Sequence, residues 1–234
     1  TELLMRHPEK NCGLYAIHND ADGERHFTYW RSDSAARLTL ELLADRSELL
    51  LDRPPANFYF SGISLAILEP ASRDAIWPLL EQLRLAGTRV FFDTNYRPRL
   101  WEDPHTARQT IEQALQACDC ALPGVEDLEL LCGIRGAKEA GTYLRGLGVR
   151  EMVLKNGPLE ILYGNPDDPG AFSVTPVQSV VDTTAAGDSF NGTLLGALSK
   201  GQSLRQAIAR GSAVAARVIQ HRGAILPRQG TRVS

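Results

Sequence analysis

The sequence predicts an α/β protein with a doubly wound, mostly parallel sheet, helices on both faces and a small β lid. Two observations support this fold class. From Ala56 onward, predicted strands alternate with predicted helices, as in a parallel sheet covered on both faces. Before that point, two short aromatic segments flank a polar turn. The chain has 234 residues, enough for one sizeable domain with a small appendage.

The lid is predicted from two segments, 14–18 and 26–30, which are rich in aromatic and β-branched residues. A polar stretch at 19–24, containing an Asp-Gly pair, joins them as a turn. We therefore expect residues 12–32 to form part of a β-hairpin lid.

The alternating region contains four strand candidates and several helix candidates. The strands are expected at 58–68, 88–93, 118–122 and 151–155, and the helices between them at 71–85, 104–117, 125–131 and 137–147. After Val174 we expect a second hairpin-like region, followed by two closing helices at 186–199 and 204–221.

Composition narrows the range of partners. Charged residues make up 23% of the chain and the formal net charge is -3, which argues against a broad electrostatic grip on nucleic acid or an acidic membrane. Apolar runs such as 63–68 are far shorter than the roughly 20 residues that cross a bilayer. The four cysteines lack zinc-site spacing, and no secretory signal is readable, so we expect reduced thiols in a cytoplasmic protein.

The segment 182–188, Asp-Thr-Thr-Ala-Ala-Gly-Asp, carries the strongest chemical signal. It runs from small residues into a predicted helix, whose first N–H groups and dipole favour an anion. Asp188 at the first turn would stand beside a phosphate, within reach of an attacking hydroxyl. The alternative is that Asp188 only stabilises the helix dipole and that Ala185 to Gly187 form an ordinary turn.

This segment, continued by Ser-Phe, resembles the C-terminal signature of the ribokinase-like (PfkB) family of carbohydrate kinases, usually Asp-Thr-x-Gly-Ala-Gly-Asp. The resemblance implies that Asp188 is the catalytic base and that Ala185, Ala186 and Gly187 form the anion hole. Alanine stands at the usual first glycine. We therefore expect Ala185 not to adopt a glycine-only backbone conformation.

A second motif, Asp-Thr-Asn-Tyr-Arg at 93–97, looks like the Asp-x-Asn-x-Arg motif of 2-keto-3-deoxygluconate kinases. The resemblance implies that it faces both substrates, with Asn95 and Arg97 near ATP. Physically, the Arg97 guanidinium can pair with a carboxylate or a phosphate, which favours an acid sugar as substrate. The alternative is a surface salt bridge at a strand end.

The hairpin also resembles the lid of these kinases, including a Tyr-x-Arg pair. By this resemblance Tyr15, Tyr29 and Arg31 contact the sugar acid, and Arg31 lies near its carboxylate. Residues 29 and 31, two apart in a strand, project from one face. Alternatively, these side chains merely cover the lid or an interface, and the exposed aromatics would suit a homo-oligomer paired through the lid.

Lys155 and Gly157 resemble the strand and turn near the nucleotide in this family, and the small residues at 213–216 suit a surface near adenine. Taken alone, Lys-Asn-Gly is a hairpin turn and the small residues suit tight helix packing. The family's Asn-x-x-Glu motif, associated with Mg²⁺, falls near Gly124 and Asp127, which differ from it. The metal ligands therefore stay unassigned, and ATP with Mg²⁺ is expected from the resemblance.

Together these features predict a ribokinase-like kinase that transfers phosphate from ATP to 2-keto-3-deoxygluconate, giving the 6-phosphate. The expected partners are a sugar acid and ATP, with no nucleic acid and no membrane. A neutral-sugar kinase of the fructokinase or ribokinase type is one alternative, and a non-catalytic relative that binds sugar acid or nucleotide is another. Residues 1–234 are expected to be a single kinase domain without the family's N-terminal part, which holds a first strand and a glycine-rich sugar-binding segment.

Overall fold

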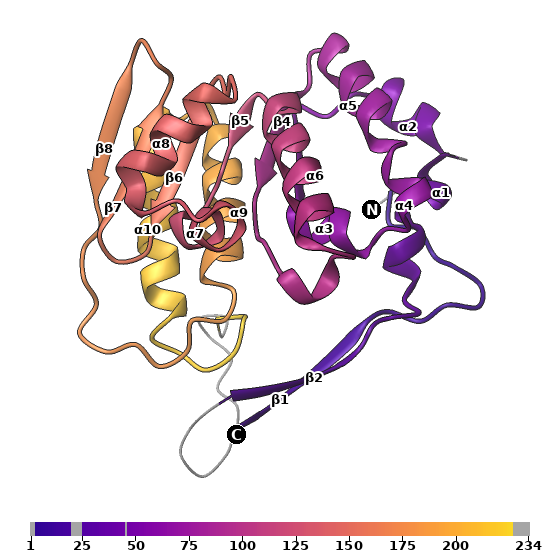
Figure 1. Cartoon of the computed structure of the whole chain (residues 1–234), viewed down its shortest axis with the longest axis horizontal. Helices are drawn as coiled ribbons and strands as arrows, with labels where there is room; N and C mark the ends of the chain where they lie inside the picture. Colours follow the sequence, from indigo (N-terminus) through magenta and orange to yellow (C-terminus); the bar gives the residue numbers. More distant parts are fainter. Residues whose placement is uncertain (1–2, 20–24, 45, 227–234) are drawn as a thin grey trace.

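The structure is a computed structural model that describes residues 3–19, 25–44 and 46–226 (Figure 1). The described residues form a two-stranded sheet and a six-stranded sheet. The two-stranded sheet is the hairpin of β1 (Leu14–Asn19) and β2 (Arg25–Trp30), in which Tyr15 lies opposite Tyr29. Figure 1 shows this hairpin extending away from the α/β body. The predicted hairpin is confirmed, while its turn at 20–24 lies outside the described residues.

The six-stranded sheet has the order β3-β4-β5-β6-β7-β8. Strands β3 to β6 are parallel, whereas β7 and β8 continue the sheet as antiparallel strands. The strands are β3 (Asn57–Ser61), β4 (Arg89–Asp93), β5 (Cys120–Ala121), β6 (Met152–Asn156), β7 (Glu160–Gly164) and β8 (Pro169–Ser173).

Helices cover both faces of this sheet, as predicted. They are α1 (Thr39–Ala44), α2 (Ser47–Leu51), α3 (Gly62–Ile67), α4 (Pro70–Arg73), α5 (Ile76–Leu85), α6 (Pro104–Ala117), α7 (Val125–Cys132), α8 (Gly136–Gly146), α9 (Ala186–Leu198) and α10 (Leu204–Val218), with 3₁₀ turns at Ala35–Leu38 and Pro98–Leu100. None of these helices is both long and apolar enough to span a bilayer, in the part of the chain that the structure describes.

Two apolar cores lie on opposite faces of the sheet because side chains alternate along each strand. Phe92 packs into the larger core with residues of α3, α5, α6, α7 and α8. Its neighbour Phe91 packs into the smaller core with residues of α9 and α10. Both phenylalanines are fully buried. Strand β4 therefore runs through the middle of the protein, and its carboxyl end carries the 93–97 motif.

Two predicted elements are wrong in part. The strand expected at 58–68 ends at Ser61, and Gly62–Ile67 form helix α3. A short apolar run does not distinguish a buried strand from a buried helix by periodicity. The second hairpin, expected after Val174, lies before it, because β6, β7 and β8 form consecutive antiparallel pairs that end at Ser173. No strand or helix occurs from residue 174 to residue 185.

Candidate active site

A polar cavity of about 420 Å³ lies at the carboxyl ends of β4 and β6 and at the N-terminus of α9. The structure brings most of the predicted site residues together here. Its lining includes residues predicted to bind ATP, to form the anion hole and to act as the base: Asn95, Arg97, Lys155, Ala185, Ala186, Gly187 and Asp188. The lining also contains Asp93 and Asp127, for which no individual role was predicted from the sequence.

The backbone of Ala185 lies in the left-handed region, with φ 60° and ψ 17°. Glycine favours this region but other residues also enter it, so the structure does not contradict the expectation that Ala185 avoids a glycine-only conformation. Left-handed backbone strains a residue with a Cβ atom but does not exclude alanine. The conformation starts α9 at Ala186, whose amide donates to the carbonyl oxygen of Thr183 at 3.2 Å. The amides of Gly187 and Asp188 follow at helix positions that have no intrahelical acceptor.

Asp188 is exposed and belongs to the first turn of α9, so its carboxylate faces the polar cavity beside these amides. The amides and the positive end of the helix dipole favour an anion at this end of the cavity. A carboxylate placed next to an anion site has the chemistry of a general base for a group that attacks the anion.

Lys155 supplies a positive charge to the same cavity from the end of β6. Its ammonium nitrogen lies 3.1 Å from the Oδ1 atom of Asp93, whose side chain is 5% exposed. Asp93 therefore holds the lysine within the cavity wall. The sequence identified Asp93 only as part of a motif. Its pairing with a residue 62 positions away follows from the parallel sheet, where strand ends meet at one edge.

Arg97 and Asp127 face each other at a second point of this cavity. The Nη1 atom of Arg97 lies 3.7 Å from Asp127 Oδ1 and donates to the Tyr96 carbonyl oxygen at 2.9 Å. The Thr94 hydroxyl donates to Asp127 Oδ2 at 2.7 Å. Burial raises the pKa of Asp127, although the Thr94 hydrogen bond opposes the rise. The Arg97 side chain is 55% exposed and can turn toward a bound anion.

No group of three or more His, Cys, Asp or Glu side chains in the described ranges is arranged to hold a metal ion. Asp127 at the cavity is an oxygen donor of the kind that Mg²⁺ prefers. Because Mg²⁺ commonly binds one or two carboxylates together with substrate phosphates and waters, the residues present fit a nucleotide-bound ion. Asn95, whose φ is 30°, also lines this cavity and has a buried Oδ1 atom without a hydrogen-bond partner in the structure.

An apolar cavity of about 400 Å³ adjoins the polar cavity. The two share Lys155, Thr183, Ala186 and Gly187 in their linings. The rest of the apolar lining comes from the β6–β7 turn, the irregular segment after β8, and helices α9 and α10, and includes Gly157, Val180, Phe190, Ala215, Ala216 and Ile219. The predicted residues Lys155 and Gly157 and part of the 213–216 segment therefore line one cavity.

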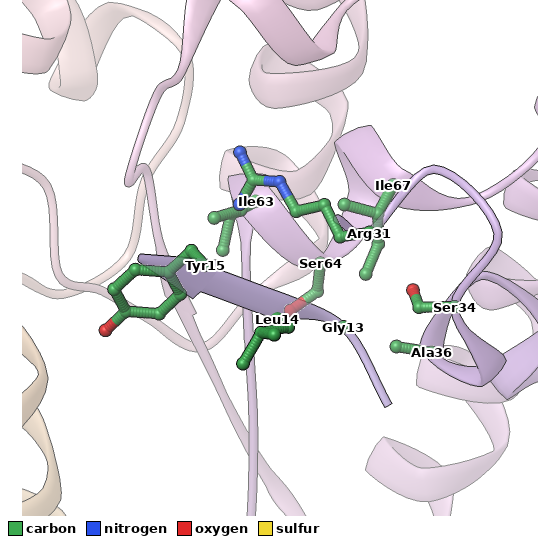
Figure 2. Close-up of a pocket in the computed structure, with 9 residues that line it drawn as sticks. All are labelled: Gly13, Leu14, Tyr15, Arg31, Ser34, Ala36, Ile63, Ser64 and Ile67. Atoms are coloured by element: carbon green, nitrogen blue, oxygen red, sulfur yellow. The ribbon is translucent and has the colours of Figure 1, made fainter. Parts of the chain in front are cut away.

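A third cavity, of about 300 Å³, lies between the base of the hairpin and α3 (Figure 2). Figure 2 shows Arg31 extending over Ile63, while the ring of Tyr15 points away from Ser34. The Arg31 guanidinium stacks on the Tyr29 ring at 4.1 Å, and the Tyr15 and Tyr29 rings lie 6.3 Å apart. The structure thus brings the three predicted lid residues together, in a place separate from the polar cavity.

Comparisons with known proteins identify the class of protein to which this fold belongs. A solved structure of a putative ribokinase II from E. coli, in complex with ATP and Mg²⁺, superposes with a TM-score of 0.71 at 24% identity, over 86% of this chain and 63% of that one. The fold is therefore ribokinase-like, as predicted. Residues 1–230 match the family described as pfkB family carbohydrate kinase. The chain belongs to this family.

Two curated relatives are more similar in sequence. The 2-dehydro-3-deoxygluconokinase of Escherichia coli (strain K12) is 40% identical over 98% of this chain and 75% of its own length. The enzyme of the same name from Dickeya dadantii is 41% identical over 97% of this chain and 74% of its own length. The family resemblance inferred from the two motifs and the hairpin is thereby confirmed.

Proposed function

We propose that the chain transfers the γ-phosphate of ATP to the 6-hydroxyl of 2-keto-3-deoxygluconate, which is also called 2-dehydro-3-deoxygluconate. The observation that carries this proposal is the identity of 40–41%, over nearly the whole chain, with two kinases named for that acid. The predicted activity agrees with their names. The structure adds a polar cavity in which Asp188, Lys155 and Arg97 meet.

ATP fits the two adjoining cavities when its base and ribose occupy the apolar one. The polyphosphate then crosses the shared lining of Lys155, Ala186 and Gly187 into the polar cavity. There the helix N-terminus and the two side-chain cations stabilise the charge of the phosphates. Mg²⁺ bound to the phosphates would neutralise further charge, and the Asp127 carboxylate in the cavity lining would hold it directly or through water.

Asp188 accepts the proton of the attacking hydroxyl. Its carboxylate lies beside the amides that would hold the transferred group, so base and phosphate are positioned by one helix turn. The predicted anion hole of Ala185, Ala186 and Gly187 serves this step through its backbone. Most of the rate enhancement in such a site comes from positioning and electrostatics.

The sugar acid is bound from the lid side. Arg31 supplies a cation for its carboxylate, and Tyr15 and Tyr29 supply hydroxyl groups and ring faces. This arrangement favours the acid over a neutral sugar, because a neutral ligand would leave the guanidinium without an anionic partner. The cytoplasmic location expected from the sequence stays a prediction.

Turnover of the sugar acid tests this proposal directly. The assay measures ADP release with 2-keto-3-deoxygluconate, fructose and ribose in competition. The expected result is preferential turnover of the acid and a loss of kcat of about 10²–10⁴-fold in Asp188→Asn. A preference for fructose or ribose would support the neutral-sugar alternative, and nucleotide binding without turnover would support the non-catalytic one. Full activity in Asp188→Asn would overturn the role of the base.

A further inference from the structure

A partly buried polar network connects strands β3, β4 and β6 to helix α9, next to the polar cavity. Its centre is Asn191, which is 1% exposed. The Asn191 Oδ1 atom accepts from Lys155 Nζ at 3.2 Å. The Asn191 Nδ2 atom donates to Asp93 Oδ2 at 2.9 Å and to the Tyr59 hydroxyl at 3.3 Å. Both ends of the amide are therefore engaged.

The partners fix the orientation of this amide. Reversing it would place the NH₂ group against the ammonium of Lys155 and the carbonyl oxygen against the carboxylate of Asp93, and both contacts are unfavourable. A hydrophobic residue can make neither hydrogen bond. An aspartate would place a second carboxylate beside Asp93. The site therefore requires a side chain that accepts from a cation and donates to an anion at the same time.

Tyr59 completes the network from β3. Its hydroxyl accepts from Asn191 and lies 3.3 Å from Asp93 Oδ2. Burial raises the pKa of Tyr59, and the carboxylates of Asp93 and Asp188 add to the rise. The hydroxyl therefore stays protonated and remains a donor to Asp93.

Lys155 retains binding capacity despite these contacts. An ammonium group has three N–H donors, and the hydrogen bonds to Asp93 and Asn191 use two of them. The residue lines both the apolar and the polar cavity. Its third N–H is available to a ligand that spans the two, such as the polyphosphate of a nucleotide. A lysine on a flexible stem holds such a position only when its other donors are fixed.

Asn191 lies three residues after Asp188, and residues at this spacing share one side of a helix. Its hydrogen bonds to Lys155 and Asp93 therefore anchor the side of α9 that presents Asp188. The first turn of the helix and the end of β6 are held together by one buried amide.

We propose that Asn191, completed by Asp93 and Tyr59, is a positioning residue that fixes the ammonium of Lys155 at the junction of the two cavities and relative to Asp188. This inference rests on the proposed phosphotransfer, in which Lys155 meets the polyphosphate. Asn191 does not touch substrate. It acts through Lys155.

A double-mutant cycle tests the proposal with Asn191→Leu, Lys155→Met and the double variant. Removing Lys155 is expected to lower kcat/KM for ATP by about 10²-fold, as for other groups that stabilise transition-state charge. Asn191→Leu alone is expected to lower it about tenfold, mainly through KM for ATP, with KM for the sugar acid little changed. The double variant should then be no worse than Lys155→Met alone. An additive loss of about 10³-fold, or an unchanged Asn191→Leu enzyme, would overturn the positioning role.

Two further measurements keep the test decisive. Tyr59→Phe removes one hydroxyl from the rim of the network and should raise KM for ATP about twofold to threefold without loss of folding. The matched control is Asn165→Ala, which removes the two hydrogen bonds that Asn165 Oδ1 accepts from the amides of Asp167 and Asp168 in the exposed turn between β7 and β8, outside the network. It should lower Tm with unchanged kinetics.

Nucleotide binding separates the two proposals. If the wild-type chain binds ADP in calorimetry but phosphorylates none of the sugars, the proposed function fails and the positioning role is judged by binding alone. Asn191→Leu should then weaken ADP binding about tenfold in the presence of Lys155 and not in the Lys155→Met background. Equal weakening in both backgrounds would contradict the inference.

Discussion

Gly62 lies so close to Thr94 that a Cβ atom on Gly62 would stand 2.0 Å from the Thr94 carbonyl oxygen. The contact joins the start of α3 to the end of β4. Ile63 and Ser64, which follow Gly62, line the lid cavity, and Asn95, which follows Thr94, lines the polar cavity. The spacing of the two cavities therefore depends on a residue without a side chain.

The first prediction concerns this contact. Gly62→Ala should lower the free energy of unfolding by about 2–3 kcal/mol, because backbone on both sides must move to admit a methyl group. Denaturant unfolding measures the change. The control is Gly196→Ala within α9, where an added Cβ meets nothing within 4 Å and helix propensity should raise stability by roughly 0.5–1 kcal/mol. Equal stability of the two variants would show that the close approach is not present in solution.

A second prediction follows from the left-handed backbone of Ala185. Ala185→Gly should raise the free energy of unfolding by about 0.5–1 kcal/mol, because glycine adopts this conformation without the strain of a Cβ atom. The variant keeps the backbone amide of residue 185, so phosphotransfer should persist. Ala186→Gly, one residue later and inside the helix, should lower stability instead by about 0.5 kcal/mol. Thermal unfolding of both variants gives the comparison, and a loss in both would argue against left-handed backbone at Ala185.

Asp127 leads to a third prediction, on pH. Burial raises its folded pKa above the unfolded value of about 3.9, so the folded state binds this proton more tightly than the unfolded state. The contribution of Asp127 to the free energy of unfolding therefore falls as pH rises from the pKa of the unfolded state to the pKa of the folded state. Above the folded-state pKa the contribution is fully lost. Asp127→Asn should be more stable than wild type at pH 7.

The difference in stability between Asp127→Asn and wild type should shrink as pH falls toward about 4, where the wild-type carboxyl becomes protonated. Urea unfolding across this range checks the trend. Glu126→Gln removes one negative charge from an exposed side chain of the same cavity and controls for the change in net charge. A constant difference at all pH values would show that burial of the Asp127 carboxylate is not the cause.

The hairpin gives a fourth prediction. Leu14 and Trp30 are directly opposite in the β1–β2 pair, and they are 60% and 57% exposed. A two-stranded hairpin with apolar side chains in water is marginal alone and is stabilised when a partner covers it. We expect a homo-oligomer paired through this lid. Leu14→Glu combined with Trp30→Glu should yield monomers in sedimentation measurements, whereas Leu159→Glu, on an exposed turn, should leave the assembly unchanged. Wild-type monomers at all concentrations would refute the pairing.

Local chemistry explains which elements could be predicted from the sequence. Helix α6 has the bounds that the sequence predicts because Asp103 is an N-cap, accepting from the amides of His105 and Thr106, and Pro104 follows at the first helical position. The strand predicted at 58–68 extends too far because its apolar character also suits a buried helix. The strand ends at Ser61, and Gly62, the first residue of α3, lies against Thr94, a contact between distant segments that no local pattern reveals.

In the candidate site, too, contiguous motifs could be predicted and contacts between distant segments could not. The residues at 93–97 and 182–188 form contiguous motifs that the sequence alone reveals. Tyr59 and Asn191 do not, because they are 132 positions apart and meet only when β3 and α9 pack together. The available signal was an asparagine next to Phe190 and three positions before Leu194 in the helix expected at 186–199, since a buried amide needs hydrogen-bond partners.

The opposed burial of Phe91 and Phe92 has a consequence for the chemistry that follows them along the chain. A slip of β4 by one position against β3 and β5 would send each phenylalanine to the wrong side of the sheet. It would also turn Asp93 away from Lys155 and Asn191. The burial of these two apolar rings, which are remote from any substrate, thereby sets the register of β4. The register in turn sets the direction in which the Asp93 carboxylate points.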